Sequence, residues 1–193
     1  IGLMLTMLLS GFVSQRLTHH RMIVLSAWTT AAGLVLIASS GGLFAFRVGL
    51  LVLGAGAGFY LPSGVTTLTD VTPSGKLGRA IALHELGPIF GLAAAPLFAE
   101  IALTFTGWRA FMYILAAASI VVGMIFGRFG SGGRFLGTPP QWRQLYEIMK
   151  KRRFWIIAFF FIMAIGLEIG VYSMLPAYLI DGAEDIRPEW FEG

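Results

Sequence analysis

Apolar and polar positions alternate along this chain in long blocks rather than in short periods. The apolar stretches approach the ~20 residues that a helix needs to cross a membrane, and short polar loops separate them. The pattern predicts spanning helices at residues 22–39, 43–68, 79–105, 108–129 and 154–180. It therefore predicts an all-α, polytopic bundle of about six transmembrane helices when a partial first helix is included.

The first apolar stretch is too short to span a membrane. The chain opens on Ile1, and residues 1–14 would cover only about 20 Å as a helix, against a hydrocarbon core of ~30 Å. We interpret this segment as the end of a helix whose start is missing, and we expect the chain to be a fragment. After the last span, the acidic residues 181–193 would begin an outer loop.

Composition narrows the class of protein further. Of the 193 residues, 56% are hydrophobic and 12% are charged, against about 25% charged residues in a soluble domain. The mean hydropathy is +0.78. The absence of cysteine excludes disulfides and thiolate metal sites. The segment Ser74-Gly75-Lys76 lacks the rest of a phosphate-binding loop. We expect no enzyme, no metal and no cofactor, apart from H⁺ as a coupling ion.

The basic residues predict the orientation. Most of the 14 Lys and Arg residues lie in the loops 15–21, 69–79 and 128–153, and the alternate loops are nearly uncharged. The positive-inside rule places these three loops in the cytoplasm of a multi-pass protein in a bacterial-type inner membrane. Because the basic residues lie at helix ends, the net charge of +4 does not indicate nucleic-acid binding.

Residues 130–153 are the one long segment expected outside the membrane. They begin with a flexible Ser-Gly-Gly stretch, pass through two prolines and end in four basic residues. Apolar side chains between them recur at spacings compatible with an amphipathic surface helix: Trp142, Leu145, Tyr146, Ile148 and Met149. We therefore divide the chain into a first half at 1–129, a cytoplasmic linker at 130–153, and the first helix of a second half at 154–193.

Ionisable residues at membrane depth are costly and tend to be functional. Arg47 lies about one turn inside its span, on the helical face of Gly54 and Gly58, so we expect it to point toward neighbouring helices. Snorkelling to the outer interface is the alternative. Glu168 lies near the centre of the last span, with Tyr172 one turn further on. This pair suits proton binding or substrate contact, and an internally satisfied packing role is the alternative.

His84 and Glu85 form a further ionisable pair, about two turns inside their predicted helix. A pH-sensitive pair and an interfacial location fit this position equally. No second histidine follows at the spacing of a zinc site, so we expect no metal here.

Small residues form stripes on two predicted helices. The first helix carries Gly54 and Gly58, and the second carries Gly87 and Gly91, followed by Pro96. In lipid, small side chains let helix backbones approach closely. Two interpretations stay open: structural packing, and a close contact that slides or rocks between two states.

Several motifs follow one another along the chain in an order, and on sides of the membrane, that resemble a known family. The loop Gly11-Phe-Val-Ser-Gln15-Arg16-Leu-Thr-His-His-Arg21 begins with glycine and is basic, and Arg47 lies two helices later. They resemble the helix 2–3 signature and the helix 4 arginine of the major facilitator superfamily of secondary transporters. The loop has Gln15 where the family usually has Asp, and Thr18 where it has a second Gly.

The rest of the chain extends this resemblance. Gly91, Ala95 and Pro96 hold the spacing of a helix 5 motif, and Gly107-Trp108-Arg109 opens a sixth helix. The basic segment 130–153 resembles the linker between six-helix halves, and Gly170-Val-Tyr-Ser-Met-Leu-Pro176-Ala-Tyr-Leu resembles helix 7. The chain would thus cover about helix 2 to helix 7 of a twelve-helix protein.

The resemblance implies a transporter whose two halves rock around a central site. Arg47 would attract an anionic substrate or modulate a proton site. Glu168 would be a proton or substrate carboxylate, and Tyr172 a hydrogen-bonding residue of the cavity. Four residues of the basic loops would make cytoplasmic gate contacts: Gly11, Arg16, Arg21 and Arg79.

We therefore predict transport of a small solute by alternating access, as proton-coupled symport or antiport. The expected partners are a small-molecule substrate, the lipid bilayer and the missing C-terminal half of the same polypeptide. A non-transporting sensor or receptor on the same scaffold and a membrane-embedded enzyme are the alternatives. Sugars, organic anions, amino acids and drugs all fit as substrates.

Overall fold

The structure is a computed structural model that describes residues 1–138 and 142–185, with the backbone alone at Trp142, Gln144, Leu145 and 175–185. The end of the acidic tail and the side chains of Trp142 and Leu145, which carry part of the predicted amphipathic pattern, lie outside the described residues. The protein is 85% helical, and the described residues form no strand. The predicted all-α fold is confirmed.

Seven α-helices and one short 3-10 helix make up the described chain. They are α1 (Gly2–Val13), α2 (His19–Ala38), α3 (Leu43–Val71), η1 (Ser74–Lys76), α4 (Leu77–Phe105), α5 (Trp108–Phe129), α6 (Trp142–Met149) and α7 (Arg152–Asp185). Among the described residues, five helices are long and apolar enough to cross a membrane: α2, α3, α4, α5 and α7. The apolar α1 is shorter than these spans.

Most helix ends lie within two residues of the predicted breaks, with three differences. The last span ends five residues later than predicted, because α7 continues through Asp185, and residues 181–185, which the sequence placed in an outer loop, belong to the helix. Gly107 has a φ of +75° and separates α4 from α5, because glycine adopts this conformation without steric cost. The second helix begins three residues earlier than predicted, since the hydroxyl of Thr18 caps it by accepting the amide of Arg21 at 3.4 Å. The third continues through Asp70, which the sequence placed in a loop.

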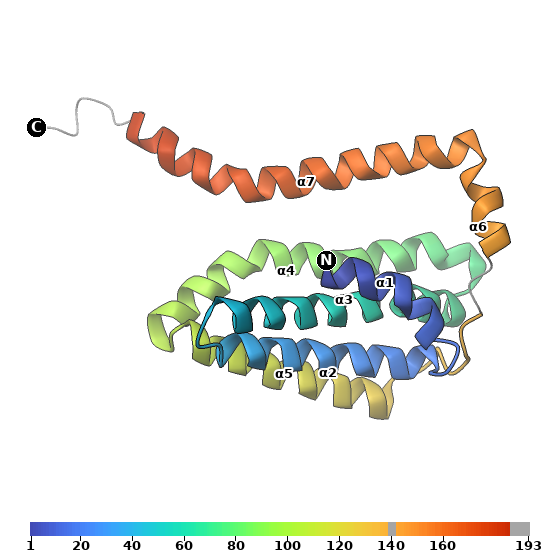
Figure 1. Cartoon of the computed structure of the whole chain (residues 1–193), viewed down its shortest axis with the longest axis horizontal. Coiled ribbons are helices and arrows are strands. Elements are labelled where there is room, and N and C mark those ends of the chain that lie inside the picture. Colours follow the sequence, from blue (N-terminus) through green and yellow to red (C-terminus); the bar gives the residue numbers. More distant parts are fainter. Residues whose placement is uncertain (139–141, 186–193) are drawn as a thin grey trace, which may run out of the picture. The chain divides into compact units, whose positions relative to one another are not determined.

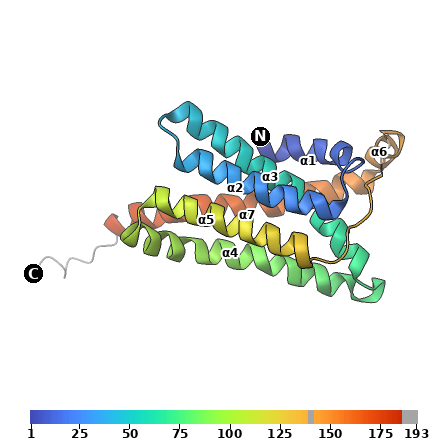
Figure 2. The same ribbon diagram turned by 90° about the horizontal axis from the view of Figure 1, so that it is seen from below.

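The chain splits into two compact units, Ile1–Pro140 and Gln141–Gly193. The first unit contains α1 to α5, and the second contains α6 and α7. Within the first unit, α2 lies between α3 and α5, and α1 lies along α3 (Figure 1, Figure 2). The first unit therefore has its core around α2.

Helices α2 and α3 approach each other closely at two glycines. An alanine Cβ at Gly33 would lie 2.5 Å from the amide nitrogen of Leu53, and one at Gly49 would lie 2.7 Å from Cγ1 of Ile37. Such close approach is possible only because these positions lack side chains. The two helix backbones therefore touch along α2.

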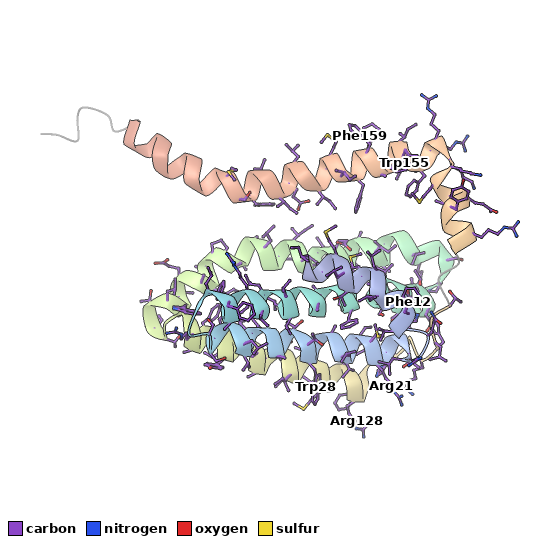
Figure 3. The ribbon with its side chains drawn as sticks, in the orientation of Figure 1. Phe12, Arg21, Trp28, Arg128, Trp155 and Phe159 are labelled. Carbon is purple, nitrogen blue, oxygen red and sulfur yellow. The ribbon has the colours of Figure 1, made fainter. Side chains whose placement is uncertain are left out.

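Small residues of α5 make its contact with α2. The hydroxyl of Ser119 donates to the carbonyl of Ala27 at 2.9 Å, and a Cβ at Gly123 would lie 2.9 Å from Cβ of Ala27. Ala116 is buried with Leu34. The sequence analysis did not identify this stripe. Trp28, next to Ala27, is 54% exposed on the outer side of α2 (Figure 3).

Candidate functional site

A strap, residues 131–138, follows α5 and folds back along the α1–α2 loop. The amide of His20 donates to the carbonyl of Gly133 at 2.8 Å, and Thr18 and Leu136 form an isolated antiparallel bridge. The strap therefore lies at the end of the first unit that carries the predicted cytoplasmic loops. We call this end the basic end.

Asp70, at the end of α3, holds the turn that begins the strap. Its Oδ2 accepts a hydrogen bond from the amide of Gly133 at 3.1 Å. Gly132 and Gly133 have φ angles of +82° and +64°, in the left-handed region that favours glycine. The sequence predicts a flexible stretch here, whereas the structure shows a hydrogen-bonded turn.

Side chains beneath the strap connect it to α1, α2 and α3. The ring of Phe135 packs edge-on against His19, with 5.1 Å between ring centroids. Nδ1 of His19 lies 3.3 Å from Oγ of Ser63 on α3, and the amide of Gly137 donates to the carbonyl of Ser14 at 2.8 Å. The strap thus joins three helices of one unit.

Replacing Asp70 with alanine is expected to release the strap. Leaving the amide of Gly133 unpaired would destabilise the docked strap by about 1 kcal/mol. The fraction of molecules with the strap released would therefore rise roughly fivefold. Trypsin cleavage after the exposed Arg134 should therefore become about fivefold faster. Thr69→Ala is the matched control, because the Thr69 hydroxyl bonds only within α3. Equal cleavage rates in the two variants would contradict the role of Asp70.

The predicted gate residues lie at the basic end. Gly11 is half-buried in the last turn of α1, and the three arginines are exposed: Arg16, Arg21 and Arg79. Among the described residues, none of these arginines forms an ion pair. Figure 3 shows Arg21 at the same end of the unit as Arg128. Their role as gate contacts stays a prediction.

Arg47 lies in the second turn of α3 and is exposed. We expected it to point toward neighbouring helices because it shares a face with Gly54 and Gly58. On that face, the contact with α1 that lies nearest to Arg47 is at Leu51, which lies against Gly2. Arg47 lies one turn before Leu51, and it has no hydrogen bond or ion pair among the described residues. The expected inward contact is therefore absent from the described unit.

The predicted packing residues lie in two different environments. A Cβ at Gly58 would lie 2.7 Å from the carbonyl oxygen of Leu3, and one at Gly54 would lie 3.0 Å from the Leu3 nitrogen. By contrast, no described atom lies within 4 Å of a Cβ at Gly87 or Gly91. Pro96, inside α4, is exposed. The stripe on α3 therefore contacts α1, whereas Gly91 of the α4 stripe borders a cavity that Phe111 and Leu115 of α5 also line.

Glu168 and Tyr172 belong to α7, in the second unit. The two side chains are exposed and lie one helical turn apart, on one face of α7. Glu168 makes no ion pair among the described residues. The two stand in the unit that does not contain Arg47. Their roles in binding stay predictions.

A cluster of ionisable side chains joins α3 to α4. The hydroxyl of Tyr60 lies 2.8 Å from Nε2 of His84, and Nδ1 of His84 lies 3.2 Å from Oε1 of Glu85. The rings of Tyr60 and His84 stack at 5.9 Å, with 13° between their planes. The sequence analysis noted His84 and Glu85 but missed Tyr60, because no local spacing connects residues on separate helices.

The apolar helices define the class of the protein, and the comparison with known families shows to which family it belongs. Five apolar helices within the described residues make it an integral, multi-pass membrane protein. The sequence model of the Major Facilitator Superfamily matches residues 1–184, and the chain belongs to this family. No curated protein matches the chain. Membership identifies a membrane transporter in general, with a small-molecule substrate and a lipid environment.

Proposed function

We propose that the protein moves a small solute across a membrane by alternating access, coupled to protons. The observation that carries the proposal is the family match over residues 1–184, together with the five apolar spans. Orientation with the basic end in the cytoplasm follows from the positive-inside rule.

Arg47 and Glu168 are the residues proposed to act on solute and proton. Each lies within an apolar span, where an ionisable group is retained at a cost. Arg47 would attract an anionic group of the solute. Glu168 would bind and release the coupling proton, with Tyr172 as a hydrogen-bonding neighbour. The exposure of all three side chains within their own units supports a role toward a partner outside the unit.

Uptake into proteoliposomes containing the natural full-length polypeptide tests this function. A panel of radiolabelled sugars, organic anions, amino acids and cationic drugs would be offered with and without an imposed pH gradient. Uptake of one class that rises with the gradient and collapses with a proton ionophore is expected. Absence of uptake for every class, from protein that retains its helical spectrum, would contradict transport.

Two variants test the assigned roles on the solute that is taken up. Arg47→Ala should reduce uptake roughly tenfold or more, the loss expected when a hydrogen bond to a charged group worth ~1.5–3 kcal/mol is removed. Glu168→Gln should remove the dependence on the pH gradient. Matched controls are Arg143→Gln and Glu147→Gln, whose side chains pair with each other at 3.4 Å on α6. If both test variants behave like the controls, the assignment is wrong.

A further inference from the structure

The cluster of Tyr60, His84 and Glu85 lies beside a cavity of about 410 Å³ in the first unit. Tyr60 and His84 both line this cavity, which α2 and α5 border with uncharged residues such as Ala27 and Val122. Of its described lining residues, Tyr60 and His84 are the only titratable ones. The cavity is thus an apolar chamber with one ionisable wall.

Two other ionisable groups near this chamber bond to the backbone, although Nδ1 of His20 is buried without a partner among the described residues. Asp70, at the end of α3, accepts the amide of Gly133, and Nε2 of His20, on α2, lies 3.4 Å from the carbonyl of Gly127. Glu85 is therefore the carboxylate that acts on His84 among the described residues. The Glu85 side chain is 57% exposed and that of His84 only 19% exposed.

We propose that Tyr60, His84 and Glu85 form a proton-binding site that controls the direction of the Tyr60 hydroxyl toward the chamber. The inference rests on the proposed function, because it names a second site at which a coupled proton is bound. It adds to the assignment of Glu168, which lies on α7. Imidazole is the side chain that ordinarily gains and loses a proton in the physiological range.

The geometry determines which nitrogen of neutral His84 carries the hydrogen. An ionised Glu85 only accepts hydrogen bonds, so Nδ1 of His84 must be the donor to it. The unprotonated Nε2 then accepts the hydrogen of the Tyr60 hydroxyl. In this state Tyr60 directs its hydrogen away from the chamber and leaves an oxygen lone pair toward it.

Binding of one proton reverses the bond to Tyr60. A hydronium ion transfers a proton to Nε2: one O–H bond of the hydronium ion breaks and leaves water, while one N–H bond forms, and the Nδ1–H and Tyr60 O–H bonds stay intact. Nε2 now donates, so the Tyr60 oxygen accepts and the hydroxyl hydrogen turns to the chamber. Release of the proton restores the first state. The protonated site therefore offers a donor to an acceptor oxygen of a solute, and the neutral site does not.

Nitrogen NMR of the full chain, labelled with ¹⁵N in histidine, tests this site directly. The sequence contains three histidines, and His84→Gln identifies the signals of His84. Free imidazole in histidine prefers hydrogen on Nε2, whereas the site requires it on Nδ1 when His84 is neutral. Tyr60→Phe and Glu85→Gln should each lower the ratio of the Nδ1–H to the Nε2–H form about fivefold, as expected for loss of one hydrogen bond.

Tyr113→Phe and Glu100→Gln, on α5 and α4, are the matched controls and should leave the ratio unchanged. A wild-type ring with hydrogen mainly on Nε2, or a ratio that neither test variant changes, would overturn the proposal. Proton entry into proteoliposomes, followed with a trapped pH-sensitive dye, separates this result from the proposed function. Solute-driven proton entry that persists in His84→Gln would overturn the coupling role of the site alone. Its absence from the wild-type protein would overturn coupled transport.

Discussion

Replacing Gly33 with alanine is expected to destabilise the first unit by about 1–2 kcal/mol, after the gain in helix propensity is subtracted from the cost of overpacking. The new Cβ would lie 2.5 Å from the nitrogen and 2.7 Å from Cα of Leu53. Both atoms belong to the backbone of α3, so a change of side-chain rotamer cannot relieve the contact. The two helices must move apart, and overpacking of this kind costs ~1–3 kcal/mol. Because α2 makes the contacts that organise the unit, the loss should affect the whole unit.

The measurement is the free energy of unfolding in detergent micelles, followed by circular dichroism during titration with a denaturing detergent. Gly78→Ala is the matched control, because Gly78 is also helical but no described atom lies within 4 Å of its Cβ. Alanine favours a helix over glycine by up to ~1 kcal/mol, so this control should be slightly stabilised. The two substitutions thus have opposite expected signs. Equal stability of the two variants would contradict the close contact of α2 and α3.

Gly33 also shows which contacts local sequence patterns can predict. The glycines of α3 and α4 predict a close helix contact because they recur every four residues, as Gly54 and Gly58 do. Gly33 has no such repeat, and its partner Leu53 lies on the next helix. The pattern also fails in the other direction, because Gly87 and Gly91 repeat in the same way yet contact no described helix. A repeat of small residues indicates a helix face that another helix can approach closely. Whether another helix does so, and which one, depends on the tertiary structure.

The spans themselves were predictable because lipid imposes a length on each helix and few residues end one. Gly107 illustrates this, since its positive φ lies between two spans as the sequence predicts. The strap was not predictable from composition. Its Ser-Gly-Gly sequence resembles a flexible linker, and hydrogen bonds to Asp70 and His20, both far away in sequence, turn it into a defined bend.

In the candidate site, too, contacts between neighbours in sequence are predictable and contacts between helices are not. His84 and Glu85 are adjacent in sequence, so their pairing could be anticipated. Tyr60 is separated from His84 by 24 positions, and the hydrogen bond between them exists only because α3 and α4 meet there. For Arg47, helical periodicity correctly identifies the face that it shares with Gly54. It does not tell which helix covers that face at Arg47, whose side chain is exposed among the described residues.

The largest stabilisation is expected from a disulfide between the strap and the α1–α2 loop. The chain has no cysteine, so Thr18→Cys with Leu136→Cys introduces one defined pair. The two positions face each other in an antiparallel bridge, where Cα atoms lie ~4.5–5.5 Å apart, within the range that a disulfide spans. Oxidation should form the bond almost completely. It closes a loop of roughly 120 residues and should stabilise the unit by about 2–4 kcal/mol.

Reduction should remove this gain, and the unfolding titration used for Gly33 would measure both states. The control pair is Thr18→Cys with Gly41→Cys, because Gly41 lies at the opposite end of α2 in the turn before α3 and cannot reach Thr18. Failure of the test pair to oxidise faster than the control pair would mean that the strap does not lie along the loop.

The same disulfide separates two modes of alternating access. The strap and the α1–α2 loop belong to one compact unit, so a rocking motion of rigid halves would carry them together. We therefore expect oxidised protein to retain uptake in proteoliposomes while gaining stability. A block of uptake that reduction reverses would instead show that the strap must leave the loop in every cycle. The first unit would then change its internal structure during transport, and Asp70 and Gly133 would become the hinge of that change.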